Sequence, residues 1–553
     1  MHVLSAAEMQ ACDRATTERF GIPSLDLMRN AAAAVAGFAR EQFPLAQRVT
    51  VLCGTGNNGG DGMMAARLLS EAGLKVITLL LGEPEQLKGD AAVAWSELNN
   101  PKHGEVRVIA HAHDPAEHDD AFRTDLIVDA LFGTGFRPPL PPLALAVLEW
   151  MQHSSAPVLA PILAPILSID LPSGWLADET QATPSGTVFP ADAVITFTAP
   201  KPAHVFGQLT RRWDQPVVVA PIGSPEESIR SQLNLDWAGS SLELVQRARP
   251  TAANKGNFGH VLVVGGSFGS AGGKAGAPTM TALAALRAGA GLVTAAVPAP
   301  ALPVISSFAA ELMTWPLAAT KEGQIAAENL DAKQVAALTE GKTVLAIGPG
   351  MGQCAETAKF TIGLLSATRI PTVIDADALN ILATDTTQLA TLAKGRTLVV
   401  TPHPGEMARL LGCTIAEVQA DRLNTARNFA QRMGVTVVLK GARTLIAHPD
   451  GRVAVNTSGN PGMAKGGSGD LLTGLVAGLL AQDPHDPAHA VEAAVYLHGL
   501  AADLAVREGD EHTLLATDYL AQLARAYQSH LHGFEVGGKN GYVWLQGALH
   551  AAD

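Results

Sequence analysis

The stretch Val51-Leu-Cys-Gly-Thr-Gly-Asn-Asn-Gly-Gly-Asp-Gly62 has the pattern of a buried strand that runs into a glycine-rich turn. Its glycines include the spacing GxGxxG at Gly54, Gly56 and Gly59. Glycine lets the backbone approach a phosphate closely, and the N-terminus of a following helix, expected here over Met63–Ala72, favours negative charge. We therefore expect a dinucleotide or another phosphate compound at this turn. The next strand ends in Leu79-Leu-Leu-Gly82 without the acidic residue that binds the ribose in simple dehydrogenases, so that class is disfavoured.

Amide and carboxylate side chains stand among these glycines, at Asn57, Asn58 and Asp61. Two further strand ends carry similar oxygen donors and glycines, in Val128–Pro139 and Ser168–Gly174. Ligands of parallel sheets bind outside the carboxyl ends of the strands, so we expect the three segments to meet at one crevice that can also hold a cation. Each segment taken alone could be an Asp-capped turn.

Strand-like and helix-like segments alternate along the whole chain, which predicts the α/β class. The predicted strands of the first half are Arg48–Cys53, Lys75–Leu81, Asp125–Asp129, Ile166–Asp170, Ala193–Phe197 and Pro216–Val219. Those of the second half are His260–Val264, Gly291–Val297, Thr343–Ile347, Thr372–Asp375, Thr397–Val400 and Thr436–Leu439. Between the halves, a stretch rich in glycine, serine and proline predicts a domain boundary near residue 240. We interpret the APxL repeats of Ala156–Leu167 as an extended loop or strand edge, and 527–553 as a loosely packed tail.

Length and charge limit the classes of function. The 553 residues allow two to four cores, and the net charge of −13 lacks the basic surface of a nucleic-acid or anionic-membrane binder. Four widely spaced cysteines form no disulfide framework or zinc motif, so we expect a reduced, cytoplasmic protein. The sequence has neither the pattern of a signal peptide near Met1 nor an apolar stretch of about 20 residues that would span a membrane.

A second glycine-rich loop, Gly459–Gly474, precedes an apolar helix and contains the motif GGSGD. The amides of Gly467, Ser468 and Gly469 can form an anion hole for a transferring phosphoryl group, and Asp470 is placed to take a proton from a hydroxyl. Asp470 alone could equally be a helix N-cap. Upstream, Lys440 and Thr444 end a strand and suit nucleotide phosphates, while the Walker A motif of P-loop enzymes is absent.

The first half resembles the NAD(P)HX epimerase domain over about residues 1–220, through GTGNNGGDG, DALFGTGF, SIDLPSG and the helical lead-in Leu4–Ala32. The resemblance implies a Rossmann-like three-layer αβα sandwich and a potassium ion bound by Asn58, Asp129 and Ser173. It implies substrate contacts from Asn57, Asn58, Gly59, Gly60, Asp61, Gly133, Thr134, Gly135, Phe136, Arg137, Pro138, Pro139 and Asp170. Arg29 stands where the family usually has glutamate, which leaves the role of that glutamate unassigned.

The second half resembles the ribokinase-like superfamily and, over about residues 245–525, the ADP-dependent NAD(P)HX dehydratase. Its motifs include GPGMG, DADALN, TPHPGE and NPGMAKGGSGD in the family's order. The resemblance implies a ribokinase-like αβα domain, substrate contacts from Ala277, Gly350, His403 and Asp470, and nucleotide contacts from Lys440, Gly441, Ala442, Arg443, Thr444 and Gly469. The segment Ser270–Lys274 leaves the choice of Ala277 over Ala275 open, and His403 alone could be a packed loop histidine.

Together the halves resemble the bifunctional NAD(P)H-hydrate repair enzymes, with an epimerase domain over 1–240, a dehydratase domain over 241–526 and a tail over 527–553. The implied activity is epimerisation of hydrated NADH and NADPH (NADHX and NADPHX), assisted by Asp170 or Asp129, followed by ADP-dependent dehydration with Asp470 as base. The resemblance also implies K⁺ at the first site and Mg²⁺ with ADP at the second, and we expect a homo-oligomer. Two other classes remain open, a small-molecule kinase fused to a nucleotide-binding domain and a non-catalytic pyridine-nucleotide sensor.

Overall fold

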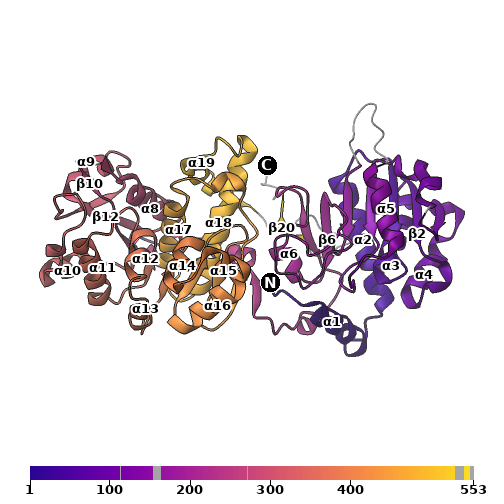
Figure 1. The fold of residues 1–553 in the computed structure, drawn as a ribbon, viewed down its shortest axis with the longest axis horizontal. Coiled ribbons are helices and arrows are strands. Elements are labelled where there is room, and N and C mark those ends of the chain that lie inside the picture. Colours follow the sequence, from indigo (N-terminus) through magenta and orange to yellow (C-terminus); the bar gives the residue numbers. More distant parts are fainter. Residues whose placement is uncertain (113, 154–163, 271, 530–540, 548–553) are drawn as a thin grey trace. The chain divides into compact units, whose positions relative to one another are not determined.

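The computed structural model describes residues 1–112, 114–153, 164–270, 272–529 and 541–547 (Figure 1). They form two compact units, one of Met1–Leu235 with residues 541–547 and one of Asp236–Ser529. The sequence places the boundary at nearly the same point, near residue 240. Most of the APxL repeats fall within 154–163, outside the described residues.

The first unit is built on an eight-stranded sheet in the order β20-β7-β6-β5-β4-β1-β2-β3. The strands are β1 (Arg48–Cys53), β2 (Lys75–Leu81), β3 (Glu105–Ile109), β4 (Leu126–Ala130), β5 (Ile166–Ile169), β6 (Ala193–Phe197), β7 (Val217–Ala220) and β20 (Val543–Gln546). The helices are α1 (Ala6–Glu18), α2 (Ser24–Gln42), α3 (Asn57–Glu71), α4 (Gly89–Leu98), α5 (Pro142–His153) and α6 (Pro202–Phe206), with 3-10 segments η1 (Pro84–Gln86), η2 (Pro101–His103), η3 (Asp114–Phe122) and η4 (Glu226–Ser228).

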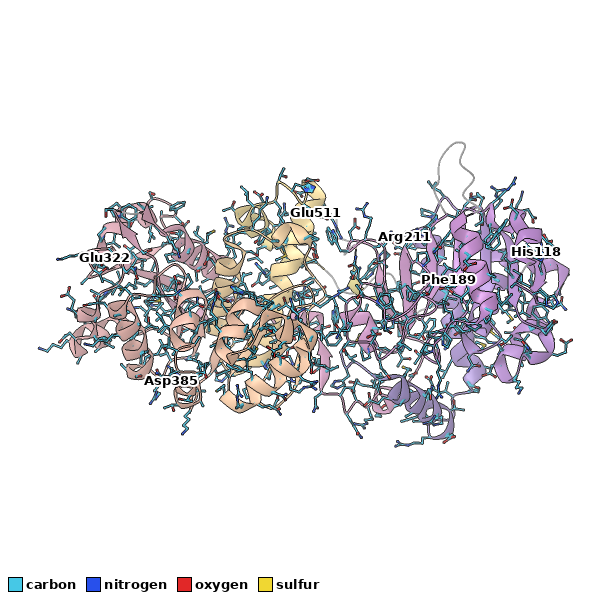
Figure 2. All side chains as sticks on the ribbon, in the orientation of Figure 1. His118, Phe189, Arg211, Glu322, Asp385 and Glu511 are labelled. Carbon is cyan, nitrogen blue, oxygen red and sulfur yellow. The ribbon has the colours of Figure 1, made fainter. Side chains whose placement is uncertain are left out.

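Strands β1 to β7 pair in parallel, and the strand order reverses beside β1, between its neighbours β2 and β4. This is the Rossmann order, in which the crevice lies outside the carboxyl ends of the strands at the reversal. Hydrophobic side chains fill the space between the layers; Phe189, labelled in Figure 2, is 1% exposed and belongs to the cluster that includes Leu52 and Ile127.

Helix α3 begins at Asn57, so the expectation of a helix starting at Met63 is wrong. The residues NNGGDG form the first turns of the helix instead of the preceding turn. Glycine is needed there because a Cβ at Gly59 would overlap the carbonyl oxygen of Gly54, and one at Gly62 would overlap Ala130. The glycines let the helix pack directly on the β1 and β4 strand ends.

The second unit is built on a ten-stranded sheet in the order β13-β12-β9-β14-β15-β16-β17-β18-β19-β8. The strands are β8 (Leu235–Trp237), β9 (His260–Val264), β12 (Leu292–Pro298), β13 (Met313–Leu317), β14 (Val344–Ile347), β15 (Thr372–Ile374), β16 (Leu398–Val400), β17 (Thr436–Leu439), β18 (Leu445–Ala447) and β19 (Val453–Val455), and β10 (Phe268–Gly269) pairs separately with β11 (Gly272–Gly273). Strands β9 and β12 to β17 are parallel, and β17, β18 and β19 are antiparallel.

The helices of the second unit are α7 (Leu242–Val245), α8 (Gly276–Arg287), α9 (Leu302–Ser306), α10 (Ala332–Thr339), α11 (Ala355–Ala367), α12 (Ala376–Leu382), α13 (Thr387–Leu392), α14 (Pro404–Leu411), α15 (Ile415–Ala420), α16 (Arg422–Met433), α17 (Ser468–Gln482), α18 (Pro487–Glu508), α19 (Ala516–Ala521) and α20 (Leu523–Gln528). Its 3-10 segments are η5 (Ala238–Ser241), η6 (Lys255–Phe258), η7 (Ala299–Ala301), η8 (Ala327–Leu330) and η9 (Pro461–Met463). Helix α17 packs so closely on α8 that a Cβ at Gly474 would overlap the carbonyl oxygen of Thr281.

Every strand predicted from the sequence corresponds to a strand of the structure, and the α/β class is confirmed. Strands β3, β8, β10, β11, β13, β18, β19 and β20 are additional. The expectation of a loose tail is wrong for residues 541–547, because β20 pairs antiparallel with β7 at the edge of the first sheet (Figure 1). Trp544 is 2% exposed, and the Tyr542 hydroxyl donates a hydrogen bond to the carbonyl of Ala34 (3.1 Å).

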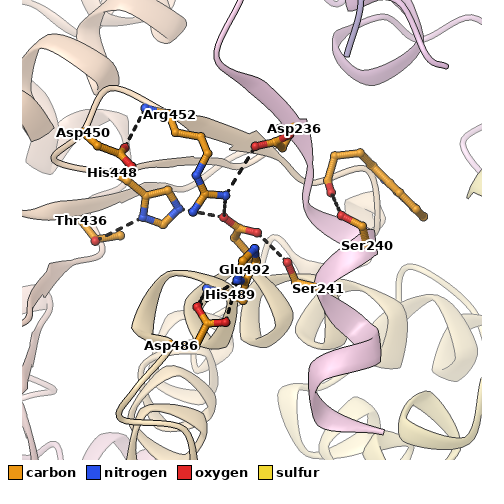
Figure 3. Close-up of polar contacts among 11 residues, drawn as sticks. Asp236, Ser240, Ser241, Thr436, His448, Asp450, Arg452, Asp486, His489 and Glu492 are labelled. Atoms are coloured by element: carbon orange, nitrogen blue, oxygen red, sulfur yellow. Dashed lines mark hydrogen bonds and ion pairs between the residues drawn. The ribbon is translucent and has the colours of Figure 1, made fainter. Parts of the chain in front are cut away.

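A buried polar network ties the start of the second unit to its core (Figure 3). Glu492 of α18 is 1% exposed and accepts a hydrogen bond from the Ser241 hydroxyl (2.6 Å). Arg452 NH1 lies 2.8 Å from Glu492 and 3.5 Å from Asp236, and His448 Nε2 lies 2.9 Å from Glu492. The network therefore anchors β8 and η5 to α18 and to the β18–β19 hairpin.

Among the described residues, the helices that are long enough to cross a bilayer are not apolar enough to do so, and the apolar ones are too short.

Candidate active sites

A cavity of about 570 Å³ opens in the first unit at the strand reversal. It is lined from α1, α2 and α3, from the segment after β4, and from Asp170 and Lys201. The structure brings most of the predicted substrate contacts together there, namely Asn57, Asn58, Asp61, Gly133, Thr134, Gly135, Phe136 and Asp170. The predicted contacts Gly59, Gly60, Arg137, Pro138 and Pro139 are not among its lining residues.

Glycine serves packing as well as ligand access at this site. Gly60 faces the side chain of Met28, which would lie 2.7 Å from an added Cβ. At Gly133, an added Cβ would lie 2.5 Å from Asp170 Oδ2 and 3.0 Å from Asn58 Oδ1. Glycine at position 133 therefore lets two polar side chains, one from helix α3 and one from the end of β5, approach the same point.

Asp170 is held in place by four donors. Its Oδ2 accepts from the Thr134 amide and hydroxyl (both 2.6 Å), and its Oδ1 accepts from Thr196 Oγ1 (2.8 Å) and Lys201 Nζ (2.9 Å). Its backbone has φ +65°, in the left-handed region that non-glycine residues rarely occupy. Burial opposes ionisation of this carboxyl, but the charge of Lys201 and the hydrogen bonds outweigh it and lower the pKa of Asp170.

Lys201 and His204 support this carboxylate from the segment after β6. Lys201 is 2% exposed and also donates to Thr196 Oγ1 (2.7 Å). The Lys201 amide donates to His204 Nδ1 (3.0 Å), so His204 Nε2 carries the proton and donates to the Asp170 carbonyl (2.7 Å). Burial, reinforced by Lys201, lowers the pKa of His204 to about 4. The histidine is neutral and fixes the strained backbone of Asp170.

Two further carboxyl groups, Asp13 of α1 and Asp61 of α3, line the same cavity. Burial raises the pKa of Asp13 to about 6, with Lys201 acting in the opposite direction. Burial, with the charges of Asp170 and Asp13, raises the pKa of Asp61 well above its usual range. The cavity therefore holds both a firmly ionised carboxylate, Asp170, and two carboxyl groups whose pKa values are raised.

Asp129 and Ser173, two of the predicted potassium ligands, are both completely buried. Ser173 donates its hydroxyl to Asp129 Oδ1 (2.5 Å) and its amide to Oδ2 (2.8 Å). Among the described residues no lysine or arginine pairs with Asp129, and burial raises its pKa. A buried carboxylate without a cationic neighbour has the donor chemistry of a cation site.

The third predicted potassium ligand, Asn58, contributes an amide on the cavity wall. Its Nδ2 is buried without a hydrogen-bond partner among the described residues. An unpartnered buried amide is costly, so a ligand that engages this side chain would remove a penalty. The residues present thus fit a cation or an anion-bearing substrate, although no hydrogen bond in the described structure joins Asn58 to the Asp129–Ser173 pair.

In the second unit, Asp470 lies in the first turn of α17, after Gly467 with φ +94°. Burial and the neighbouring charge of Asp375 raise the pKa of Asp470 to about 7, while Lys440 and Lys274 act in the opposite direction. A carboxyl group with such a pKa can accept and release a proton near neutral pH.

Lys440 occupies the centre of this site. Its Nζ lies 2.9 Å from Asp375 Oδ1 and 3.7 Å from Glu406 Oε2, and a Cβ added at Gly469 would lie 3.4 Å from it. Asp375 is 2% exposed and also accepts from the Thr473 hydroxyl (2.8 Å). Lys440 therefore both neutralises buried carboxylates and faces the glycine loop where a phosphate is expected.

The turn Lys440–Thr444 is held from two sides. Arg422 of α16 donates to the carbonyls of Ala442 (2.5 Å) and Lys440 (3.4 Å), and Arg443 NH1 donates to the Thr457 carbonyl (3.2 Å). Thr444 Oγ1 donates to the carbonyl of Gly441 (2.8 Å). The side chains of Arg443 and Thr444 are thus bonded within the protein, and the open groups of this turn are mainly its backbone.

A neighbouring set of predicted contacts comes from three other strand ends. His403 caps α14, with its Nδ1 accepting from the amides of Gly405 (3.0 Å) and Glu406 (3.2 Å). Its side chain is 50% exposed, and burial with the charge of Lys440 lowers its pKa. A Cβ added at Gly350 would lie 3.2 Å from the Cβ of Ala277. The alternative substrate contact, Ala275, is buried. The structure thus places Ala277 directly against the GPGMG turn.

The comparisons with known proteins cover both halves. A family model described as "NAD(P)H-hydrate dehydratase" matches residues 261–525, and one described as "YjeF-related protein N-terminus" matches 24–203. The chain is 39% identical over 532 residues to the bifunctional NAD(P)H-hydrate repair enzyme Nnr of Moorella thermoacetica, covering 94% of this chain and 95% of that one. The enzyme of the same name from Escherichia coli is 36% identical, covering 94% and 93%. The chain belongs to the bifunctional NAD(P)H-hydrate repair enzymes.

Two of the solved structures that match the chain each cover about half of it. The ADP/ATP-dependent NAD(P)H-hydrate dehydratase of Bacillus subtilis, co-crystallised with ATP and Mg²⁺, is 32% identical, with a TM-score of 0.43 over 52% of this chain and 96% of its own. A ribokinase-like superfamily protein of Enterococcus faecalis is 28% identical, with a TM-score of 0.45 over 54% of this chain and 96% of its own.

Sequence reasoning missed several polar residues of this repair enzyme. Lys201 follows the predicted strand Ala193–Phe197, and no glycine-rich motif at that strand end marks it as part of a site. Asp13 lies in the lead-in helix, and only packing of α1 brings it to the cavity. Asp375 ends the predicted strand Thr372–Asp375, and this position at the carboxyl end of a parallel strand is the signal that places it beside Asp470.

Proposed function

We propose that this chain repairs hydrated NADH and NADPH, the first unit interconverting the R and S epimers and the second dehydrating the S epimer with ADP. The observation that carries the proposal is that the chain, which is related over nearly its whole length to such repair enzymes, contains two separate sites. One is the cavity at the strand reversal, and the other places Asp470 against Lys440 and a glycine loop.

In the first unit, the open backbone of Gly56 and Gly135 and the amide of Asn58 suit the polar nucleotide part of the substrate. Lys201 is the cation that lines this cavity among the described residues, and its partner Asp170 keeps it in place. Asp129, Ser173 and Asn58 would hold K⁺. A bound K⁺ supplies positive charge to the pyrophosphate, which a chain with a net charge of −13 otherwise lacks.

In the second unit, Asp470 takes the proton of the ring hydroxyl as that oxygen accepts a phosphoryl group from ADP. Phosphate is a better leaving group than hydroxide, so its elimination restores the dihydropyridine ring. The amides of Gly467, Ser468 and Gly469 would stabilise the transferring group, and Lys440 the nucleotide phosphates.

Mg²⁺ belongs to this proposal as the ion that screens the phosphate charges of the nucleotide. Among the described residues, no group of three or more His, Cys, Asp and Glu could hold a metal ion. Mg²⁺ usually keeps several waters and binds through one or two carboxylates plus phosphate oxygens. Asp375 and Asp377 are the carboxylates whose charges act on Asp470 in this loop. Asp377 also accepts a hydrogen bond from the Gly352 amide (2.9 Å). The cytoplasmic location and the homo-oligomer remain predictions of this proposal.

The test uses Asp470→Asn in the full-length chain, with the S epimer and ADP as substrates and absorbance of the reduced nicotinamide as the readout. The variant should form NADH at least 100-fold more slowly, because a carboxamide cannot act as the base. Exchange between R and S epimers should be unchanged, since that site lies in the other unit. Glu322→Gln, which removes an exposed acid of the same unit, is the control and should keep both activities.

Loss of both activities in a folded Asp470→Asn protein would contradict the two-site assignment. Accumulation of a stable phosphorylated product by the unmodified chain would instead support the small-molecule kinase alternative.

A further inference from the structure

Helix α1 forms one wall of the cavity in the first unit. Met9, Gln10, Asp13 and Thr17 of this helix line the cavity, and their spacing places them on one helical face. Asp13 is the ionisable member of this set, so α1 delivers a single carboxyl group to the wall. The opposing wall holds Asp170 and Lys201.

The bonding of Asp13 differs from that of Asp170. All four hydrogen-bond donors to the Asp170 carboxylate are fixed groups of the protein, including the buried Lys201 at 2.9 Å. Within the described residues, the Asp13 carboxylate has no hydrogen-bond partner, and the nearby hydroxyl of Thr17 donates to the Asp13 backbone carbonyl instead (3.1 Å). A carboxyl group without competing donors can exchange a proton with a ligand, whereas one that neutralises a buried lysine cannot do so without leaving that lysine unpaired.

The charged groups around Asp13 support the same distinction. It faces Lys201 after β6, Asp170 after β5 and Asp61 on α3, and Arg14 is its neighbour on α1. Burial raises the pKa of Asp13 to about 6, while the pKa of Asp170 is lowered. At neutral pH Asp13 is mostly ionised yet close to its protonated form, as an efficient base should be.

We propose that Asp13 is the catalytic base of epimerisation and that the Asp170–Lys201 ion pair positions the substrate without exchanging protons. This inference rests on the proposed function and assigns its proton-transfer step. The resemblance of the sequence to its family points instead to Asp170 or Asp129 for that step.

The step balances with the substrate and Asp13 alone. Asp13 takes the proton of the C6 hydroxyl, the C6 oxygen forms a carbonyl, and the C6–N1 bond breaks with its electron pair moving to N1 and into the conjugated carboxamide. Rotation about the C5–C6 bond turns the other face of the aldehyde towards N1. The N1 electron pair then closes the ring on that face, and the new alkoxide takes the proton back from Asp13.

The test measures exchange of R and S epimers by the full-length protein as a function of pH, for the unmodified chain, Asp13→Asn, Asp170→Asn and Glu18→Gln. In the unmodified chain kcat should rise with pH through a midpoint near 6, since the ionised form of Asp13 is active. Asp13→Asn should lower kcat about 100-fold, remove this rise of kcat with pH (the pH limb) and leave KM within about threefold of its original value. Asp170→Asn should raise KM and retain the limb.

Two internal controls separate catalysis from folding. ADP-dependent dehydration of the S epimer by Asp13→Asn should equal that of the unmodified chain, because that site lies in the other unit. Glu18→Gln removes an exposed acid from the same helix and should change nothing.

If Asp13→Asn keeps both its rate and its pH limb while the unmodified chain epimerises, the assignment of Asp13 is wrong and the proposed function stands. If the limb disappears in Asp170→Asn alone, Asp170 is the base. If the unmodified chain does not exchange the epimers at all, the proposed function of the first unit itself fails.

Discussion

Asp470 and Asp170 carry the same side chain but hold protons very differently. Asp470 is partly buried beside another carboxylate, Asp375, and its pKa rises to about 7. Asp170 is also buried, but Lys201 and three hydroxyl or amide donors lower its pKa. The neighbours, rather than burial, therefore decide which of the two can act as a base in neutral solution.

We expect the pH dependence of dehydration to report on Asp470. Its active form is the ionised one, so kcat at saturating ADP should rise with pH through a midpoint near 7. Lys440 lowers the pKa of Asp470, so Lys440→Gln should move this midpoint to higher pH. A pH series of initial rates for both proteins checks this, and an unmoved or lower midpoint would contradict the electrostatic role of Lys440.

We also expect Asp129 to determine a specific effect of potassium on stability. The melting temperature of the first unit should be a few degrees higher in KCl than in choline chloride of equal ionic strength, because an ion bound only to the folded state stabilises it. Asp129→Asn removes the buried charge and should abolish the difference. Calorimetry of both proteins provides the measurement, with the exposed Asp26→Asn as control. An equal salt effect in Asp129→Asn would rule out Asp129 as a ligand.

At the scale of elements, helix α18 joins parts of the chain that are distant in sequence. Glu492 on this helix contacts Ser241 of η5, and His448 and Arg452 at the β18–β19 hairpin (Figure 3). Burial disfavours the charge of Glu492, yet the hydrogen bond from His448 and the charge of Arg452 outweigh it and lower the pKa of Glu492. This network, more than local propensity, holds the short strand β8 at the sheet edge.

Glu492→Gln should lower the free energy of unfolding of the second unit by about 3 kcal/mol, because it leaves Arg452 facing a neutral partner in a buried site. The lowered pKa means that the stabilisation is present above the ordinary glutamate pKa of about 4.3 and is lost as the pH falls through the folded-state pKa. Urea unfolding should therefore show a large difference in the free energy of unfolding between the unmodified chain and Glu492→Gln at neutral pH, and a smaller difference at about pH 3.

Glu508 is an exposed acid that lies on α18, like Glu492, and pairs with Arg525 of α20. Glu508→Gln should lower the free energy of unfolding by less than about 1 kcal/mol. A Glu492→Gln effect no larger than that of Glu508→Gln would show that the buried network contributes little.

At the scale of the whole molecule, the chain leaves the first unit at Leu235 and returns to it with β20. Tyr542 and Trp544 place their rings 5.2 and 6.1 Å from that of Phe38 on α2, and β20 covers the edge of β7. An uncovered β7 would expose unpaired backbone groups that favour aggregation.

A chain that stops at Ser529 should keep dehydratase activity but unfold its first unit at a lower temperature and aggregate more readily. Scanning calorimetry, with each transition assigned from the loss of one of the two activities, checks this outcome. A chain that stops at Gly547 retains β20 and is the control. Equal melting temperatures for both truncations would mean that β20 adds no stability.

The amino-acid sequence by itself determined the α/β class, the buried parallel strands and the glycine-rich or polar strand ends near which Asn58, Asp170, Lys440 and Asp470 lie, because β-branched runs and glycine-rich strand ends are local patterns. Only the tertiary structure decided the partners of those residues. The pairing of Lys201 with Asp170 and of Lys440 with Asp375, the arrival of Asp13 at the cavity and the placement of β20 beside β7 all join distant segments. Such contacts follow from the packing of helices on sheets and the gathering of strand ends at one edge, and no local spacing encodes them.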